Sequence, residues 1–233
     1  MQAALEIAEE EGIKSVSMRK VARRVDAGTM SLYHYVRTKD DLLALMDDAI
    51  MGELVIPDGE IPDGWRARLT QIAGLSLKAW MSRPWLLNDD EAFRITENGM
   101  RHADQSMGAM EGLDISTPLK SEILAQVDDY VLGFAVRERR IGGEGSVAAP
   151  GVEQAFQMIE DGLATGRFPH LAASLDPDRP FREQFAESLE QVYDEHRFDR
   201  GLRRLLDGIE LELRQIGALP GRPSRSEVEV TGE

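Results

Sequence analysis

The residues best suited to chemistry lie between positions 14 and 39, and the chemistry they suit is binding of a polyanion. This segment holds seven lysines and arginines against one carboxylate, Asp26, whereas the 233-residue chain carries a formal charge of −15. A local excess of +6 on an otherwise acidic chain is typical of a surface that docks on phosphates. Arg19 and Lys20 fall in the first turn of an expected helix, where the helix dipole disfavours cations, so an external phosphate explains them better than the helix does.

Two short helices are predicted to position these cations. The first has an apolar stripe at i, i+3, i+4 and i+7, formed by Met18, Val21, Ala22 and Val25. Ser17 is placed to cap its start. The turn DAG then ends it, with Gly28 free to adopt a positive φ, and Thr29 is expected to cap a second helix that runs through Val36. Leu32 and Val36 of the second helix would face the first.

Outward hydroxyls and rings on the second helix suit the base edges and phosphates of a DNA major groove. They are Thr29, Ser31, Tyr33, His34 and Tyr35. Thr38 begins a third helix in a pattern close to a capping box, which places Lys39 and free backbone N–H groups where a phosphate fits. Met30 fits a packing position better than a contact with a thymine methyl, and Tyr35 fits a core or a groove position equally well.

At these residues the chain resembles the tetracycline-repressor (TetR) family of transcriptional regulators. The matching strings are AALEIAEEEG, SMRKVARRV, DAG and TMSLYHYVRTKDDLL, in the same order and with the same turn length over residues 3–46. The resemblance implies that Tyr33 and Lys39 bind phosphates, and that Ser17 and Arg19 contact the DNA backbone or an adjacent base. It further implies a set of groove-facing residues: Thr29, Met30, Ser31, His34 and Tyr35.

Beyond position 54 the sequence keeps a helical period with turns and no alternating strand pattern, which predicts an all-α chain. We expect a helix-turn-helix DNA-binding domain over residues 1–54, a larger helical effector-binding and dimerisation domain over 55–219, and a polar, disordered tail over 220–233. The helices expected in the larger domain span about 65–81, 84–111 with a break near 98–99, 118–141, 151–164, 180–196 and 198–216.

Two of these helices carry apolar stripes that call for a partner helix. One stripe comprises Phe198, Leu202, Leu205, Ile209, Leu213 and Ile216, and the other comprises Val152, Phe156, Ile159 and Leu163. The resemblance implies a homodimer in which both helices of each subunit form a four-helix bundle, so that paired recognition helices read a near-palindromic operator. An ordinary core within one chain is the alternative that the residues leave open.

Methionines and aromatic residues between the helix-turn-helix and the expected dimer helices predict an adaptable apolar interior. Met100, Ala103, Met107 and Met110 share one helical face, and several aromatic residues are near in helix order. The resemblance makes this a pocket for a small, largely apolar effector, lined by Trp80, Trp85, Phe93, Met100, Met107, Tyr130 and Phe134. Plain core packing is the alternative for any one of them.

Composition excludes several other classes of protein. The absence of cysteine excludes disulfides, thiolate zinc sites and cysteine nucleophiles, and the four histidines are far apart, so we predict no catalytic residues, no metal ligands and no cofactor. His102 is expected to be structural or on the surface. Without a membrane-crossing run or a leader the protein is expected in the cytoplasm. The resulting hypothesis is a repressor that releases operator DNA on binding an effector; a helical enzyme or a protein-interaction module with a basic surface is the alternative.

Overall fold

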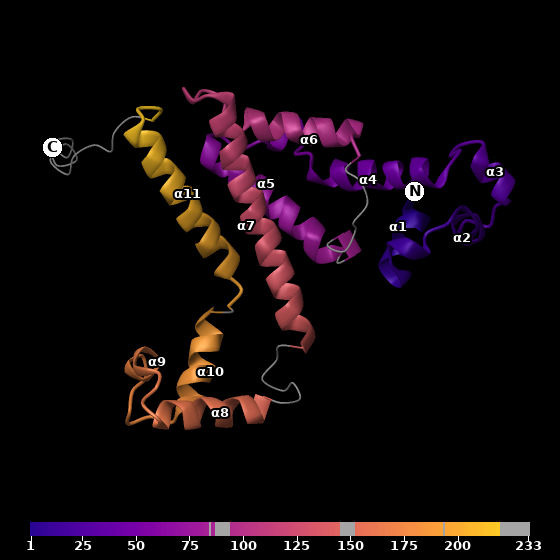
Figure 1. Ribbon diagram of the computed structural model, residues 1–233. Coiled ribbons are helices and arrows are strands. Elements are labelled where there is room, and N and C mark those ends of the chain that lie inside the picture. The colour runs from indigo at the N-terminus through magenta and orange to yellow at the C-terminus, as the bar shows by residue number, and fades with distance from the viewer. Residues whose placement is uncertain (84, 87–93, 145–151, 193, 220–233) are drawn as a thin grey trace. The chain divides into compact units, whose positions relative to one another are not determined.

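The computed structural model describes residues 1–83, 85–86, 94–144, 152–192 and 194–219, and this part of the chain is helical with short connections (Figure 1). No strand occurs among these residues, which confirms the all-α fold class. The helices are α1 Gln2–Glu11, α2 Met18–Arg24, α3 Thr29–Tyr33, α4 Lys39–Leu54, α5 Trp65–Ser82, α6 Glu97–Gly108, α7 Thr117–Glu144, α8 Val152–Ala164, α9 Pro169–Ala173, α10 Phe181–Val192 and α11 Arg197–Gln215. The 3-10 turns η1 Ile13–Ser15 and η2 Asp58–Glu60 lie between helices. No helix in the described part is both long and apolar enough to cross a membrane.

The chain divides into two compact units, and both boundaries fall inside long helices. One unit comprises residues 1–136 and 205–233, and the other comprises residues 137–204, so that α7 and α11 each contribute to both. The predicted boundary near residue 54 does not separate these units, because α4 packs against both α5 and α6 within the first one. The predicted tail over 220–233 lies outside the described residues.

The first four helices share a hydrophobic core. It is built from alanines and long aliphatic side chains of α1, α2 and α4: Ala3, Ala4, Leu5, Ile7, Ala8, Met18, Val21, Leu42, Leu43, Met46 and Ile50. Val36 belongs to this core and Leu32 packs against it, as their inward positions predicted. Trp85, which we assigned to an effector pocket, is buried in the same cluster. The ring therefore packs with the helices that carry the basic segment.

The turn between α2 and α3 differs from the expected one in two respects. Gly28 is extended, with φ −68° and ψ 138°, and Asp26 is the residue in the left-handed region, with φ 51°. Aspartate tolerates that region better than most residues with a Cβ, so this turn does not need its glycine for a positive φ. Helix α3 also ends at Tyr33, not at Val36, and Gly28 occupies its N-cap position without a side-chain hydrogen bond.

Helix α11 buries an apolar stripe within its own chain. Phe198, Leu202, Leu206, Ile209 and Leu213 are each at most 7% exposed. The predicted stripe ran through Leu205, which is half-buried, and ended at Ile216, which is 55% exposed. A spacing of four from Leu202 places Leu206 on the buried face, so the prediction was wrong by one residue there. Arg66 of α5 holds the outer side of α11 through Asp207 and, at 2.9 Å, through Glu210 Oε2.

The second unit contains a small aromatic core between α8 and α10. Phe156 contacts Phe181 and Phe185 edge to face, with ring centroids 6.1 and 5.3 Å apart. Arg182 lies 5.3 Å from the centroid of the Phe156 ring and bonds Glu153 of α8 at 2.8 and 2.9 Å. The predicted helix over 180–196 is therefore present as α10 and packs on α8, whereas the short helix α9 was not predicted.

Candidate nucleic-acid interface

Local sequence rules place the start of α2 as expected. Ser17 is the N-cap residue, and its hydroxyl accepts a hydrogen bond from the Lys20 backbone N–H at 3.4 Å. Arg19 and Arg23 are exposed one helical turn apart, and neither forms a salt bridge with any described residue. Without an ionic partner in the part of the chain that the structure describes, these two side chains are available to phosphates.

The other two cations of α2 are already bonded to α1. The Lys20 Nζ lies 2.5 Å from Glu11 Oε2. The Arg24 guanidinium donates to Glu10 at 3.0 and 2.5 Å and to Glu6 at 3.4 Å. The surface of residues 14–39 is therefore less cationic than its composition suggests, because acidic residues just before this segment balance part of its charge.

Helix α3 presents most of its side chains to solvent. Ser31, Tyr33, His34 and Tyr35 are exposed and Thr29 is half-buried. Met30 is 76% exposed, so the expectation of a packing role at the helix start was wrong. Tyr35 is 86% exposed, which excludes the core position that the sequence had left open. The inward side of this short helix is Leu32, and the rest of its surface is free for a partner.

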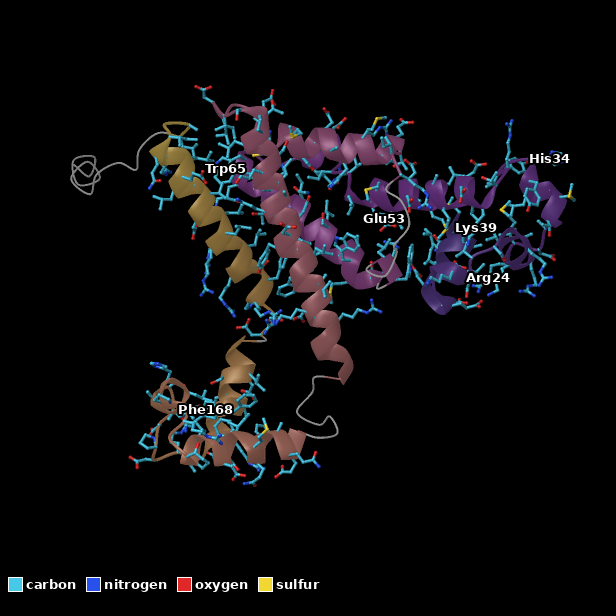
Figure 2. All side chains as sticks on the ribbon, in the orientation of Figure 1. Arg24, His34, Lys39, Glu53, Trp65 and Phe168 are labelled. Atoms are coloured by element: carbon cyan, nitrogen blue, oxygen red, sulfur yellow. The ribbon has the colours of Figure 1, made fainter. Side chains whose placement is uncertain are left out.

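The start of α4 has the predicted cap. Thr38 Oγ1 accepts from the Asp41 backbone N–H and Asp41 Oδ2 accepts from the Thr38 backbone N–H, both at 3.0 Å, which completes a capping box. Lys39 is exposed directly after the cap and forms no salt bridge with any described residue. Figure 2 shows Lys39, His34 and Arg24 on the same group of four helices. A helix start with an adjacent lysine suits a phosphate.

Helix α6 is bonded to α4 and to the residues just after it. The Asn98 backbone N–H donates to Asp48 Oδ1 at 2.8 Å, and its side-chain amide donates to Asp48 Oδ2 at 3.0 Å. Farther along, the Gln105 amide exchanges two hydrogen bonds with the backbone of Ile56, at 2.7 and 2.9 Å. These contacts connect the helix that carries Lys39 to the part of the chain in which we predicted an effector pocket.

His102 lies between these two contacts and is half-buried. Burial lowers the pKa of its imidazole, and a hydrogen bond with the backbone of Leu54 acts in the opposite direction. Its Nδ1 atom is buried and has no hydrogen-bond partner among the described residues. Burial also raises the pKa of the Asp128 carboxyl, which is electrostatically coupled to His102. We expected His102 to be structural or on the surface. That expectation did not include the groups that act on its pKa, Leu54 and Asp128, because they come from distant segments.

The predicted pocket residues do not share one environment. Trp80, Met107, Tyr130 and Phe134 are half-buried, and the rings of Tyr130 and Phe134 lie 6.2 Å apart on α7. Met100 is 58% exposed, so its inward assignment was wrong: the face of α6 that packs inward carries Ser106 instead. Phe93 lies outside the described residues. A separate open depression of about 630 Å³ at the start of α5 is lined by residues 62–67, 70 and 71.

Some of the predicted dimer residues are already buried within one chain. Leu202, Ile209 and Leu213 are 2, 4 and 1% exposed, which agrees with the alternative of an intrachain core for α11. On α8, Phe156 is buried among the phenylalanines of α10, while Ile159 and Leu163 are half-buried. The side chain of Val152, the first residue of α8, lies outside the described residues. The dimer itself stays a prediction.

Comparisons with known proteins match both parts of the chain. Residues 1–46 match the family "Bacterial regulatory proteins, tetR family", and residues 57–213 match "Tetracyclin repressor-like, C-terminal domain". The chain belongs to the TetR family of transcriptional regulators. This assignment confirms the resemblance inferred from the helix-turn-helix strings, and it identifies the TetR-family protein as a DNA-binding regulator and not an enzyme.

A curated relative supports the same family, and solved structures share the fold. The chain is similar to the HTH-type transcriptional repressor DrrR1 of Streptomyces coeruleorubidus, with 33% identity over 92% of this chain and 77% of the relative. It shares its fold with ActR of Streptomyces coelicolor in complex with actinorhodin, at 21% identity and a TM-score of 0.59 over 91% of this chain and 95% of that one. A TetR variant of Acinetobacter baumannii in complex with minocycline has 24% identity and a TM-score of 0.50, over 73% and 94% of the chains.

Proposed function

We propose that this TetR-family protein is a repressor that binds a near-palindromic operator as a homodimer and releases it when a small, largely apolar effector binds. The observation that carries the DNA-binding half of this proposal is the exposed surface of α3, next to Arg19 and Lys39, two cations that form no salt bridge within the described part of the chain. In this proposal, residues 1–54 bind DNA and residues 55–219 bind the effector and the second subunit.

The proposed contacts divide by chemistry. Tyr33, Lys39 and Arg19 bind phosphates. These contacts position residues 1–54 on the DNA without reading its sequence. The side chains available to base edges are the exposed ones on and just after α3: Met30, Ser31, His34 and Tyr35. The exposure of Met30 supports a contact with a thymine methyl, because an apolar side chain at the protein surface gains from covering one. Thr29 is half-buried, so less of its surface is available to DNA than that of these exposed residues.

The proposed response to the effector uses the contacts between α6 and α4. An effector held near Tyr130, Phe134 and Met107 would shift α6. The bond from Asn98 to Asp48 would transmit that shift to α4, and the bond from Gln105 to Ile56 would transmit it to the residues just after α4. A coupling free energy of about 1–3 kcal/mol changes operator occupancy about 5- to 150-fold. The complexes of ActR with actinorhodin and of a TetR variant with minocycline support a small-molecule effector.

Selection of the purified protein from a random duplex library at near-physiological salt tests the proposal. Sequencing of the bound pool should reveal an enriched inverted repeat, because a symmetric dimer places two recognition helices on related half-sites. A pool without any enriched motif, obtained with folded protein, would refute sequence-specific DNA binding. A thermal-shift screen of apolar compounds against the selected operator complex then tests the response to an effector.

A further inference from the structure

The four cations of α2 lie on two different sides of the helix. Arg19 and Arg23 are four residues apart and share one side, and Lys20 and Arg24 are four residues apart and share the next. Only the second pair is bonded to α1. Two residues of the same type, adjacent in sequence, therefore differ completely in their electrostatic surroundings: Arg23 has no acidic partner among the described residues, and Arg24 has two.

The partners of Arg24 are themselves spaced along one side of α1. Glu6 and Glu10 are one helical turn apart, and both carboxylates accept hydrogen bonds from the Arg24 guanidinium. Arg24 and Glu10 form a bidentate salt bridge, with Nη1 donating to Oε1 at 3.0 Å and Nη2 donating to Oε2 at 2.5 Å. This interaction lowers the pKa of the Glu10 carboxyl, so the pair stays ionised at neutral pH. Glu11 forms a single contact with Lys20, from Nζ to Oε2 at 2.5 Å.

The charge balance matters more here than the strength of the bonds. Exposed ion pairs are individually weak, and a phosphate could compete for a single arginine. However, Arg24 with Glu6 and Glu10 carries a formal charge of −1. A phosphate that approached Arg24 would meet two carboxylates, whereas a phosphate at Arg23 would meet an uncompensated guanidinium.

We propose that the glutamates of α1 hold Arg24 and Lys20 out of the DNA interface, so that Arg19 and Arg23 are the cations of α2 that bind phosphates. The inference rests on the proposed DNA binding and specifies which charges take part in it. Its consequence is that duplex DNA of any sequence is bound more weakly than the cation count of residues 14–39 implies. Non-specific binding is almost wholly electrostatic, so the glutamates reduce retention of the protein on unrelated DNA.

The expected size of each contribution follows from counterion release. Each neutralised phosphate changes the slope of log affinity against log salt by about −0.9. One such contact therefore raises the affinity about fivefold when the salt concentration falls from about 1 M to about 0.15 M. Arg23→Gln should therefore flatten the slope by about one and weaken binding to every duplex about fivefold at 0.15 M salt. Arg24→Gln should leave the slope and the affinity close to those of the wild type.

The experiment measures binding of the full chain to a fluorescent duplex by anisotropy over a series of KCl concentrations. One duplex carries the selected operator and the other carries the same bases in scrambled order, and circular dichroism verifies that each variant is folded. Arg23→Gln and Arg24→Gln remove the same charge from adjacent positions, so each is the matched control of the other. Equal flattening of the slope by both would overturn the inference while leaving DNA binding intact.

A second set of variants tests the glutamates directly. Glu6→Gln with Glu10→Gln should steepen the slope by about one and strengthen binding to the scrambled duplex about fivefold at 0.15 M salt, because Arg24 becomes available. Adding Arg24→Gln should remove that gain. Glu111→Gln with Glu122→Gln is the control for net charge. Either of two results would overturn the inference: a gain in affinity that persists without Arg24, or an equal gain in this control. A wild-type protein whose binding does not depend on salt would overturn the proposed function as well.

Discussion

Arg83 offers a direct test of how the DNA-binding helices are attached to the rest of their unit. Its side chain is 11% exposed at the end of α5, and its guanidinium donates to both carboxylate oxygens of Glu53 on α4, at 2.9 and 2.7 Å. The Arg83 Nε also lies 3.5 Å from Glu9 Oε1 of α1. One buried arginine thus connects three helices, and Figure 2 labels its main partner, Glu53.

Replacement of Glu53 by glutamine removes the main counter-charge and leaves the cation in place. Removal of one partner from a fully buried ion pair costs about 3–5 kcal/mol, whereas an exposed pair contributes about 0.2–1 kcal/mol. Because the Glu53 side chain is 51% exposed and Glu9 remains nearby, we expect an intermediate loss of about 1–3 kcal/mol. With a urea dependence of about 2–3 kcal/mol per molar, the midpoint of unfolding should fall by about 0.3–1.5 M.

Urea unfolding at one fixed protein concentration measures this change, since association of subunits would otherwise shift the midpoint. Glu97→Gln is the matched control, because Glu97 bonds Arg101 on α6 with both side chains more than 60% exposed. A pair of that kind contributes about 0.2–0.5 kcal/mol, so the midpoint of this variant should move by at most about 0.25 M. Equal shifts in the two variants would refute the reasoning that burial gives the Arg83 contact its strength.

Three further predictions follow from individual side chains. Lys39→Ala should weaken binding to operator and scrambled duplexes alike and flatten the salt slope by about one; a loss confined to the operator would assign Lys39 to base reading instead. Thr38→Ala removes the capping box of α4 and should lower the free energy of unfolding by about 0.5–2 kcal/mol, measured by urea unfolding. The pKa of His102 is lowered in the folded protein, so the unfolded chain binds more protons below pH 6.5 and stability falls as the pH falls from 7.5 to 5.5. His102→Gln should reduce that fall in melting temperature, and an unchanged pH profile would contradict the burial of a neutral imidazole.

Much of the interface was predictable because short-range rules decide it. The cap at Ser17, the capping box at Thr38 and the inward positions of Leu32 and Val36 depend on residues within one or two helical turns. The same rules gave a wrong prediction where two neighbouring residues can adopt the same backbone conformation. In the turn after α2 both Asp26 and Gly28 tolerate a left-handed conformation, and the packing of α3 on α2 placed it at Asp26.

The sequence by itself determined the helical fold class, the helix-turn-helix and the family, since each depends on periodicity and on order along the chain. Only the tertiary structure decided which charges and which apolar side chains remain available. Arg23 and Arg24 are indistinguishable in sequence, and the packing of α1 against α2 brings glutamates to one of them alone. Likewise a 3.6-residue period allows either Leu205 or Leu206 on the apolar stripe of α11, and burial within the chain selects Leu206. Helix periodicity is a local property, whereas pairing and burial depend on segments that are distant in sequence.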